Sequence, residues 1–148
     1  MKLADKLAFQ APRCLGVMRA MTGLLYLQHG LQNLFQFPAP RIPQPGEQPP
    51  PPGIDPAVIA GAAGSLELVG GVLLIIGFFT RTNAFIQSGM MAIAYFMVHA
   101  PMNFYPIING GDLAILFCFV FLYLFFAGAG EWSVDAAFSR KKNNAVTG

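Results

Sequence analysis

Apolar residues gather in four runs along this chain, and polar segments separate the runs. The runs cover approximately residues 14–37, 57–79, 83–99 and 113–128. Each is close to the roughly 20 mainly apolar residues that an α-helix needs to cross about 30 Å of hydrocarbon. They lack the alternation that is typical of barrel strands. The pattern therefore predicts an all-α membrane protein, a single domain over residues 1–148 built as a bundle of four transmembrane helices.

The composition supports this prediction. Of the 148 residues, 55% are hydrophobic and 11% are charged, against roughly 25% charged in an average soluble domain. The four runs and their short tails leave no room for a separate soluble domain. The net charge is +2, and we interpret it as a signal of membrane topology, with the lipid bilayer and not nucleic acid as the partner.

Basic residues alternate between the predicted loops. They precede the first run, lie between the second and third, and follow the fourth, whereas the other two loops hold only Arg41. The basic residues of these three segments are Lys2, Lys6, Arg13, Arg81, Arg140, Lys141 and Lys142. By the positive-inside rule both termini are cytoplasmic, which predicts a multi-pass protein of the bacterial cytoplasmic membrane. The first run is too long for a signal peptide, so we expect it to remain as helix one.

Glu67 is the only residue in the second run that can carry a charge. An ionisable group inside a membrane span is costly, and by default it is a candidate functional residue. Small residues share its helical face, namely Ala60, Ala63, Gly64, Gly70 and Gly71. Such a face packs against another helix, so we expect Glu67 to point into the bundle. Counting at 1.5 Å per residue puts His29 at a similar depth. We expect Glu67 to hydrogen-bond His29 or a neighbour on helix one.

Helix one carries more polar residues than a simple anchor needs. His29, Gln32, Asn33 and Gln36 follow the spacing i, i+3, i+4 and i+7, so they lie on one face. We expect that face to line a wet or hydrogen-bonded interior. Arg19 lies nearer the inner boundary and has two interpretations. It either extends to the lipid headgroups or forms an ion pair inside the bundle.

The outer connection between the third and fourth runs contains His99 and the sequence Asn109-Gly110-Gly111-Asp112. Asn-Gly-Gly is typical of a turn with positive φ, and we expect Asp112 to cap helix four. Histidines 29 and 99 could ligate haem only at a common depth. Their depths differ by roughly 10 Å at helical rise, which disfavours a haem site. We predict no metal site. The many aromatic residues of helix four are interpreted as packing or lipid-facing residues in preference to a quinone-stacking wall.

The predicted outer loop, residues 38–56, holds nine of the twelve prolines. Proline in this density favours an extended polyproline II spacer. A variable insertion is favoured over a ligand for a proline-binding partner. Cys14 and Cys118 lie at different depths, so we expect no disulfide. A CxxC pair is absent from the sequence, which disfavours a membrane thiol oxidoreductase.

Together these residues resemble the DoxX family of small four-helix bacterial membrane proteins. The motifs that carry the resemblance are Arg19, His29-Gly30-Leu31-Gln32, Glu67-Leu68-Val69-Gly70-Gly71, Gly77-Phe78-Phe79-Thr80-Arg81, Asn109-Gly110-Gly111-Asp112 and Gly128-Ala129-Gly130-Glu131-Trp132-Ser133-Val134-Asp135. These motifs span almost the whole chain, and their order and spacing make the combination specific.

The resemblance implies a four-helix bundle in the cytoplasmic membrane, with Arg81, Asn109, Asp112, Trp132 and Asp135 as structural motif residues. Relatives of this kind are counted as small subunits of quinone-linked oxidoreductases. The family often places a lysine where this chain has Asn33. A lysine pair with Glu67 is therefore impossible here.

Three functions remain open, and whether the chain is an enzyme stays unassigned. In the first, helices one, two and four enclose a quinone, and Glu67 and His29 exchange protons or hydrogen bonds with its oxygens. The sequence has no flavin or iron–sulfur motif, so electrons would come from a redox partner protein. The second function is a non-enzymatic scaffold that recruits a partner. The third, a small transporter, is less favoured because four helices enclose little space, although a homo-oligomer would enlarge it.

Overall fold

The computed structural model describes residues 2–39 and 55–147, and within them the chain is helical with no strand. The elements are α1 (Leu3–Phe35), α2 (Pro56–Ile76), α3 (Thr80–Ala94), the π-helical turn η1 (Tyr95–His99), α4 (Pro106–Asn109), α5 (Asp112–Ala127) and α6 (Val134–Thr147). The predicted all-α class is confirmed. The proline-rich segment lies mostly outside the described residues, so its predicted conformation stays a prediction.

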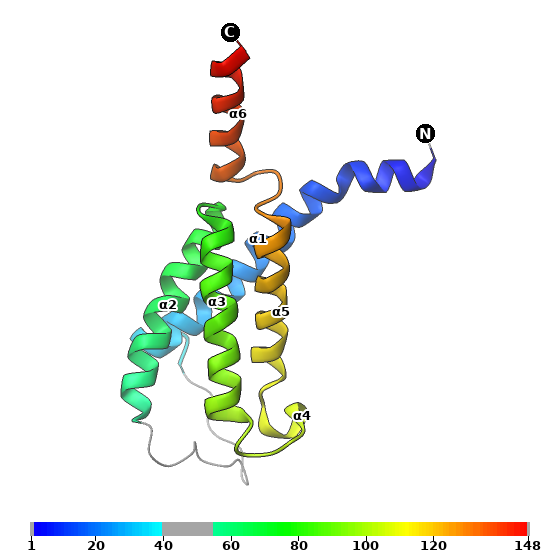
Figure 1. Cartoon of the computed structure of the whole chain (residues 1–148). Helices are drawn as coiled ribbons and strands as arrows, with labels where there is room; N and C mark the ends of the chain where they lie inside the picture. The colour runs from blue at the N-terminus through cyan, green and yellow to red at the C-terminus, as the bar shows by residue number, and fades with distance from the viewer. Residues whose placement is uncertain (1, 40–54, 148) are drawn as a thin grey trace.

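Four long helices, α1, α2, α3 and α5, form a bundle (Figure 1). The most extensive packing is between α1 and α2, and between α3 and α5. The first residues of α1, the α2–α3 turn, the end of α5 and the whole of α6 lie at one end of the bundle, and α4 lies at the other (Figure 1). We call these the α6 end and the α4 end.

The helix bounds differ from the predicted ones mainly at the start of the chain. The first helix begins at Leu3 and continues through Pro12, whereas the apolar run begins near residue 14. The second ends at Ile76 because Gly77 takes a left-handed conformation with φ of 67°. The fourth predicted helix agrees with α5 to within one residue at each end. Among the described residues, no helix combines the length and apolarity that a membrane crossing requires.

Glycine allows α1 and α2 to approach closely. A Cβ atom added at Gly30 would lie 2.5 Å from the backbone nitrogen of Leu68, and one added at Gly23 would lie 2.9 Å from the carbonyl oxygen of Gly71. Real side chains do not tolerate such distances, so a larger residue at either position would push the helices apart. The small-residue face predicted on α2 is therefore a helix-packing surface.

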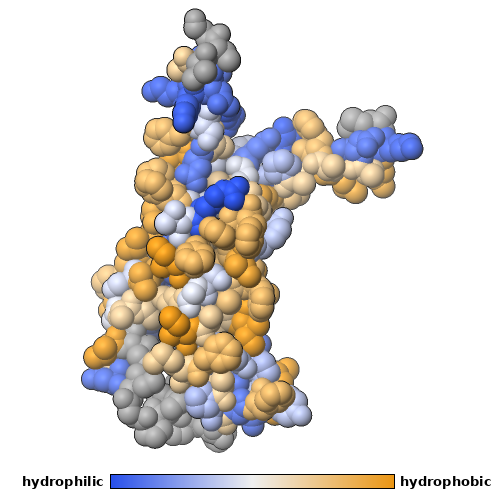
Figure 2. Space-filling view, viewed as in Figure 1, coloured by the Kyte–Doolittle hydropathy of each residue, from blue (hydrophilic) through white to orange (hydrophobic). Residues whose placement is uncertain are grey.

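Aromatic rings fill the centre of the bundle. Tyr26 from α1 meets Phe121 from α5 edge to face at 4.8 Å between ring centroids, and Phe117 stacks on Phe121 at 5.6 Å. Leu74 and Leu124 complete this core without any exposed surface. The outside of the bundle is also apolar. Figure 2 shows hydrophobic residues over its middle and hydrophilic residues concentrated toward its two ends.

Candidate functional site

Glu67 lies near the middle of α2 and is only 7% exposed. Its Oε2 accepts a hydrogen bond from Nδ2 of Asn33 on α1 at 2.7 Å. The predicted partner was His29 or a neighbour on helix one, and the structure selects the neighbour. Gly64, one turn before Glu67, makes this possible, because a Cβ there would lie 2.8 Å from the Cβ of Asn33. The close α1–α2 contact thus positions the pair.

His29 faces α5 and not Glu67. Its ring meets the ring of Phe117 edge to face, with centroids 5.9 Å apart and an interplanar angle of 88°. A cavity of about 260 Å³ lies beside this contact. The residues that line it are Leu25, Gln28, His29, Gln32, Pro38, Leu113 and Phe117. We call it the α1–α5 groove. Ligand pockets for whole small molecules usually measure about 300–1,000 Å³, so this groove suits a single ring better than a larger molecule.

The two walls of the α1–α5 groove differ in chemistry. Gln28, His29 and Gln32 form a polar wall on α1, and Leu113 and Phe117 form an apolar wall on α5. Within residues 2–39 and 55–147, the side chains of Gln28 and His29 make no hydrogen bond, while Gln32 donates to the carbonyl of Pro38 at a long 3.4 Å. The groove therefore offers unused donors and acceptors opposite an aromatic ring.

A second polar cluster connects α1, α2 and α3, and the sequence analysis missed it. The Tyr26 hydroxyl donates to Oε1 of Gln87 at 2.9 Å, and Gln87 Nε2 donates to Oδ1 of Asn83 at 3.1 Å. Gln87 also donates to the carbonyl of Leu66, and Asn83 donates to the carbonyl of Gly70. These buried groups satisfy one another, so the cluster holds the helices in register. The signal that could have revealed it is the i, i+4 spacing of Asn83 and Gln87.

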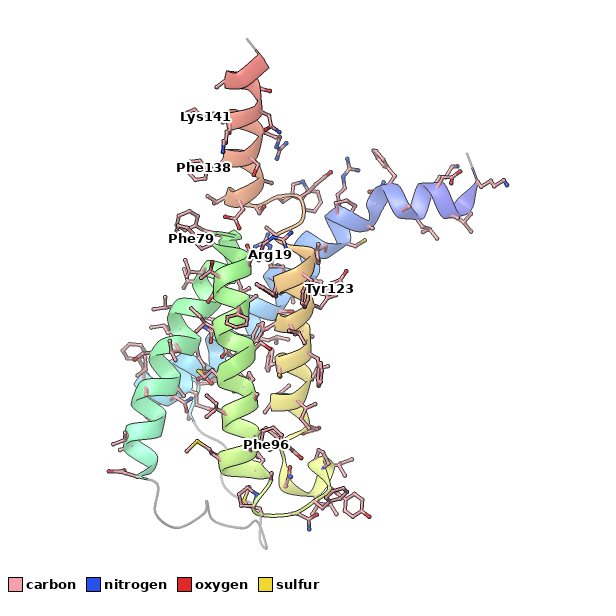
Figure 3. All side chains as sticks on the ribbon, viewed as in Figure 1. Arg19, Phe79, Phe96, Tyr123, Phe138 and Lys141 are labelled. Carbon is pink, nitrogen blue, oxygen red and sulfur yellow. The ribbon has the colours of Figure 1, made fainter. Side chains whose placement is uncertain are left out.

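Arg19 is buried at the α6 end of the bundle and is 1% exposed (Figure 3). Its guanidinium donates to the backbone carbonyls of Leu74, Ile75, Ala129 and Trp132. Both sequence interpretations of Arg19 were therefore wrong. The residue is too buried to reach the headgroups, and in the described part of the chain the only ion pair is Arg13 with Glu131. The physical reason is that α2 ends at Gly77, so the carbonyls of its last turn can accept from a side chain: Ile75 accepts from Arg19, and Leu74 accepts from Arg19 as well as from the amide of Gly77.

Two further charged residues hold helix ends beside Arg19. Arg81 donates to the carbonyls of Phe125 and Phe126 in the last turn of α5, at 2.7 and 2.6 Å. The carboxylate of Asp135 accepts from the backbone amides of Phe79 and Thr80 at the start of α3, at 3.0 and 2.9 Å. Trp132 contributes its carbonyl to Arg19, and its side chain is exposed. We call Arg19, Arg81 and Asp135, with the backbone groups that they bind, the basal clasp.

The connection at the α4 end is held by its own hydrogen bonds. Nδ1 of His99 lies 2.9 Å from the carbonyl oxygen of Asn109, whose side chain binds Asn103 and Gly111. Asp112 was wrongly expected to cap α5. Gly111 occupies the cap position, and Asp112 is the first helical residue, where its charge favours the helix dipole without a capping bond. The described residues contain no cluster of three side chains able to hold a metal.

Comparison with known proteins finds two family profiles that match this chain. The sequence profile of the DoxX family matches residues 14–100, more than half of the chain. This chain belongs to the DoxX family. A second profile, described as TQO small subunit DoxD, matches residues 58–147 of the DoxX chain. An uncharacterized protein of Haemophilus influenzae (strain ATCC 51907 / DSM 11121 / KW20 / Rd) is 38% identical over 133 residues, which cover 88% of this chain and 94% of that protein. No solved structure matches.

The two profiles together cover residues 14–147 of this DoxX protein. The DoxX match contains Arg19, His29 and Glu67, and the DoxD match contains Asp135. DoxX proteins are membrane proteins, and the DoxD description names a small subunit. The resemblance seen in the sequence is confirmed at the level of the family.

Proposed function

We propose that this DoxX protein is a multi-pass protein of the bacterial cytoplasmic membrane, in which the α1–α5 groove binds the ring of a quinone. It would act as the small subunit of a membrane oxidoreductase. The observation that carries the proposal is the groove itself, where Gln28 and His29, whose side chains have no hydrogen-bond partner among the described residues, lie opposite Phe117. An amphipathic cavity with a few convergent polar groups is the usual form of a small-molecule site.

The outer surface of the bundle supports a membrane location. Large apolar side chains are exposed on each long helix of the bundle, among them Met21, Leu24, Val69, Val72, Phe85, Ile93, Leu116 and Phe119. A soluble monomer rarely exposes so continuous an apolar surface. The basic residues Lys2, Lys6, Arg81 and Arg140 belong to segments at the α6 end (Figure 1), which agrees with a cytoplasmic position for both termini.

The groove residues suit the chemistry of a quinone. Reduction adds two electrons and two protons, and the two ring carbonyls become hydroxyls. The imidazole of His29 can pass a proton to one of these oxygens, and the amides of Gln28 and Gln32 can donate hydrogen bonds to them. Phe117 offers a ring against which the quinone packs. The electrons would come from a partner protein, and the small-subunit description of the DoxD profile supports such a partner.

Glu67 takes a different role from the one expected from sequence. It is not among the residues that line the groove. It binds Asn33, the residue that follows Gln32, and so fixes the part of α1 that forms the polar wall. In this proposal His29 contacts the quinone and Glu67 is a positioning residue.

The test compares the quinone content of matched variants purified in mild detergent. Wild type should carry quinone in stoichiometric amount, and His29→Leu should lose it while keeping its melting temperature. Ser65→Ala, an exposed change on α2 whose hydroxyl binds only its own helix, is the control and should retain the ligand. Glu67→Gln should weaken binding less than His29→Leu. An empty wild-type protein, or a His29→Leu variant with full quinone content, would contradict the proposal.

A partner-recruiting scaffold is the alternative that one observation favours. Helix α6 extends away from the bundle (Figure 1) and carries Arg140, Lys141 and Lys142 beside an exposed Phe138. If recruitment is the whole function, removing residues 136–147 should abolish activity in cells, while His29→Leu should leave it unchanged. The opposite pattern would favour the quinone site.

A further inference from the structure

The first part of α1 leaves the bundle. The N-terminal part of α1, which contains Pro12, runs sideways from the bundle axis (Figure 1). Proline has no amide hydrogen and disturbs the helical bond to the residue four positions earlier, which explains a bend at this point. Residues 2–12 are all exposed. We call residues 3–13 the N-terminal arm.

The N-terminal arm has two chemically different sides. Leu3, Leu7 and Ala11 recur every four residues and share one side, where Leu3 is 73% and Leu7 63% exposed. Lys6 and Arg13, seven residues apart, share a second stripe roughly 110° around the helix from the first at about 100° per residue, and the exposed Phe9 lies beside them. Helical spacing thus gives an apolar stripe and a basic stripe on the same short segment. Nothing in the described part of the bundle covers the apolar stripe.

The angle of the arm is fixed by the segment that precedes α6. The backbone amide of Glu131 donates to the carbonyl of Pro12 at 3.0 Å, and Arg13 pairs with the Glu131 carboxylate at 3.0 Å. A Cβ added at Gly16 would lie 2.3 Å from the carbonyl oxygen of Glu131. The bend is therefore part of the packed structure and points the arm outward in a defined direction.

The position of the arm matches the edge of the apolar surface. It leaves at the α6 end, where the hydrophobic middle of the bundle gives way to hydrophilic residues (Figure 2). Under the proposed topology this level is the cytoplasmic boundary of the membrane, and an arm at a steep angle to the bundle axis there runs along the boundary. Amphipathic basic helices bind at that depth, with apolar residues in the acyl region and cations among anionic headgroups.

We propose that the N-terminal arm is an interfacial helix that binds anionic lipids of the cytoplasmic leaflet. Leu3, Leu7 and Ala11 insert into the acyl boundary, and Lys2 and Lys6 contact the headgroups. The proposal rests on the membrane location proposed above. It adds a lipid-binding surface that is separate from the α1–α5 groove.

The chain contains a single tryptophan, Trp132, which allows a direct test. Three variants of the full chain are made, each with Trp132→Phe and one new tryptophan. The new tryptophan comes from Leu7→Trp in the first variant, Lys6→Trp in the second and Leu24→Trp in the third. Each protein is reconstituted into vesicles of phosphatidylcholine and phosphatidylglycerol whose acyl chains carry bromine, which quenches tryptophan fluorescence. The Leu7→Trp protein should lose fluorescence most with bromines near the headgroup end, because an interfacial helix lies roughly 5–10 Å deep.

The other two positions make the outcomes distinguishable. Lys6→Trp is the matched control on the basic stripe of the arm and should be quenched less than Leu7→Trp. Leu24→Trp lies on the bundle surface and should be quenched by bromines deeper in the membrane. Quenching at Leu24→Trp without quenching at Leu7→Trp would overturn the arm proposal and leave the membrane location standing. Absence of quenching at Leu24→Trp would overturn both.

The charge requirement has its own variant. Adding Lys6→Glu to the Leu7→Trp protein should reduce its quenching in vesicles that contain phosphatidylglycerol, and high salt should have the same effect on the parent protein. Vesicles of phosphatidylcholine alone should show little difference between the two proteins. Equal quenching of both proteins in every vesicle would overturn the role of anionic headgroups.

Discussion

The basal clasp and the α1–α5 groove use similar polar groups in opposite ways. In the clasp, Arg19, Arg81 and Asp135 each bind backbone groups at helix ends. In the groove, His29 and Gln28 have no hydrogen-bond partner in the described residues. A buried polar group costs free energy unless it is paired, so paired groups are explained by structure. Gln28 is exposed and His29 is half-buried, so neither carries the cost of full burial, and both side chains can bind a ligand in the groove.

The comparison also explains why the most conspicuous charges are not the best functional candidates. A guanidinium that binds four carbonyls has its donors engaged and little left for a substrate. Glu67 is intermediate, because one of its oxygens binds Asn33 and no hydrogen bond to the other occurs among described residues. Replacing clasp residues should therefore change stability first, and replacing groove residues should change ligand binding first.

The largest expected effect is in the clasp. Arg19→Leu should lower the free energy of unfolding by on the order of 4 kcal/mol, because buried carbonyls lose their only side-chain donor. The measurement is denaturation in mixed detergent micelles followed by circular dichroism. Arg19→Lys is the matched control and should recover only part of the loss, since one ammonium cannot replace the planar fork. An Arg19→Leu protein as stable as wild type would show that the basal clasp does not stabilise the fold.

Gly77→Ala should be the next most damaging change, by on the order of 2 kcal/mol. Gly77 has φ of 67°, and an added Cβ would lie 2.4 Å from the Cβ of Ser133 and 2.7 Å from Cζ of Arg19. Gly89→Ala provides a control, because no atom lies within 4 Å of a Cβ there. Since alanine favours a helix interior, the control should be neutral or more stable by up to about 1 kcal/mol. Equal melting temperatures for the two variants would contradict the close packing at Gly77.

A smaller effect is expected at Asn33, which donates to Glu67 and follows the groove residue Gln32. Asn33→Leu should cost about 1–2 kcal/mol, because the Glu67 carboxyl loses its hydrogen-bond donor. Asn33→Lys should stay within about 1 kcal/mol of wild type if the longer side chain reaches Glu67 and supplies a donor. Chemical denaturation of both variants, with quinone content as a second readout, tests this order. Loss of quinone in Asn33→Leu but not in Asn33→Lys would support a positioning role for Glu67.

The smallest effect should have the opposite sign. Thr80 is fully buried, and its hydroxyl is the one side-chain polar atom in the described residues that is buried without a partner. Thr80→Val removes that hydroxyl with little change of shape, so stability should rise by up to about 1 kcal/mol. A shift of the melting temperature to a higher value is the expected observation. A lower value would indicate that the hydroxyl has a partner such as bound water.

Sequence reasoning worked best where the signal lies in the side chains of one segment. The run at residues 113–128 predicted α5 almost to the residue, because an unbroken apolar stretch is bounded by Gly110-Gly111 and Gly128. The face that contains Asn33 was identified from helical spacing, and this face supplies the partner of Glu67. Both inferences depend on the periodicity of a single helix.

The sequence could not show which backbone groups a side chain binds, or which side of one helix faces another. Arg19 binds carbonyls, which every residue carries, so no residue type marks its partners. The side of α5 that faces His29 could not be chosen, because aromatic residues surround that helix on all sides. The start of α1 was missed because residues 3–13 mix charged and apolar residues and form no apolar run.

The continuity of α1 gives the molecule a mechanical property. The helix runs without a break from Arg19, held in the clasp, to His29, in the groove, a distance of about 15 Å at 1.5 Å per residue. Arg19 also binds the segment that leads into α6. If a bound protein rotated α6, the bonds of Arg19 would transmit the rotation to α1. The imidazole of His29 would then change its orientation in the groove.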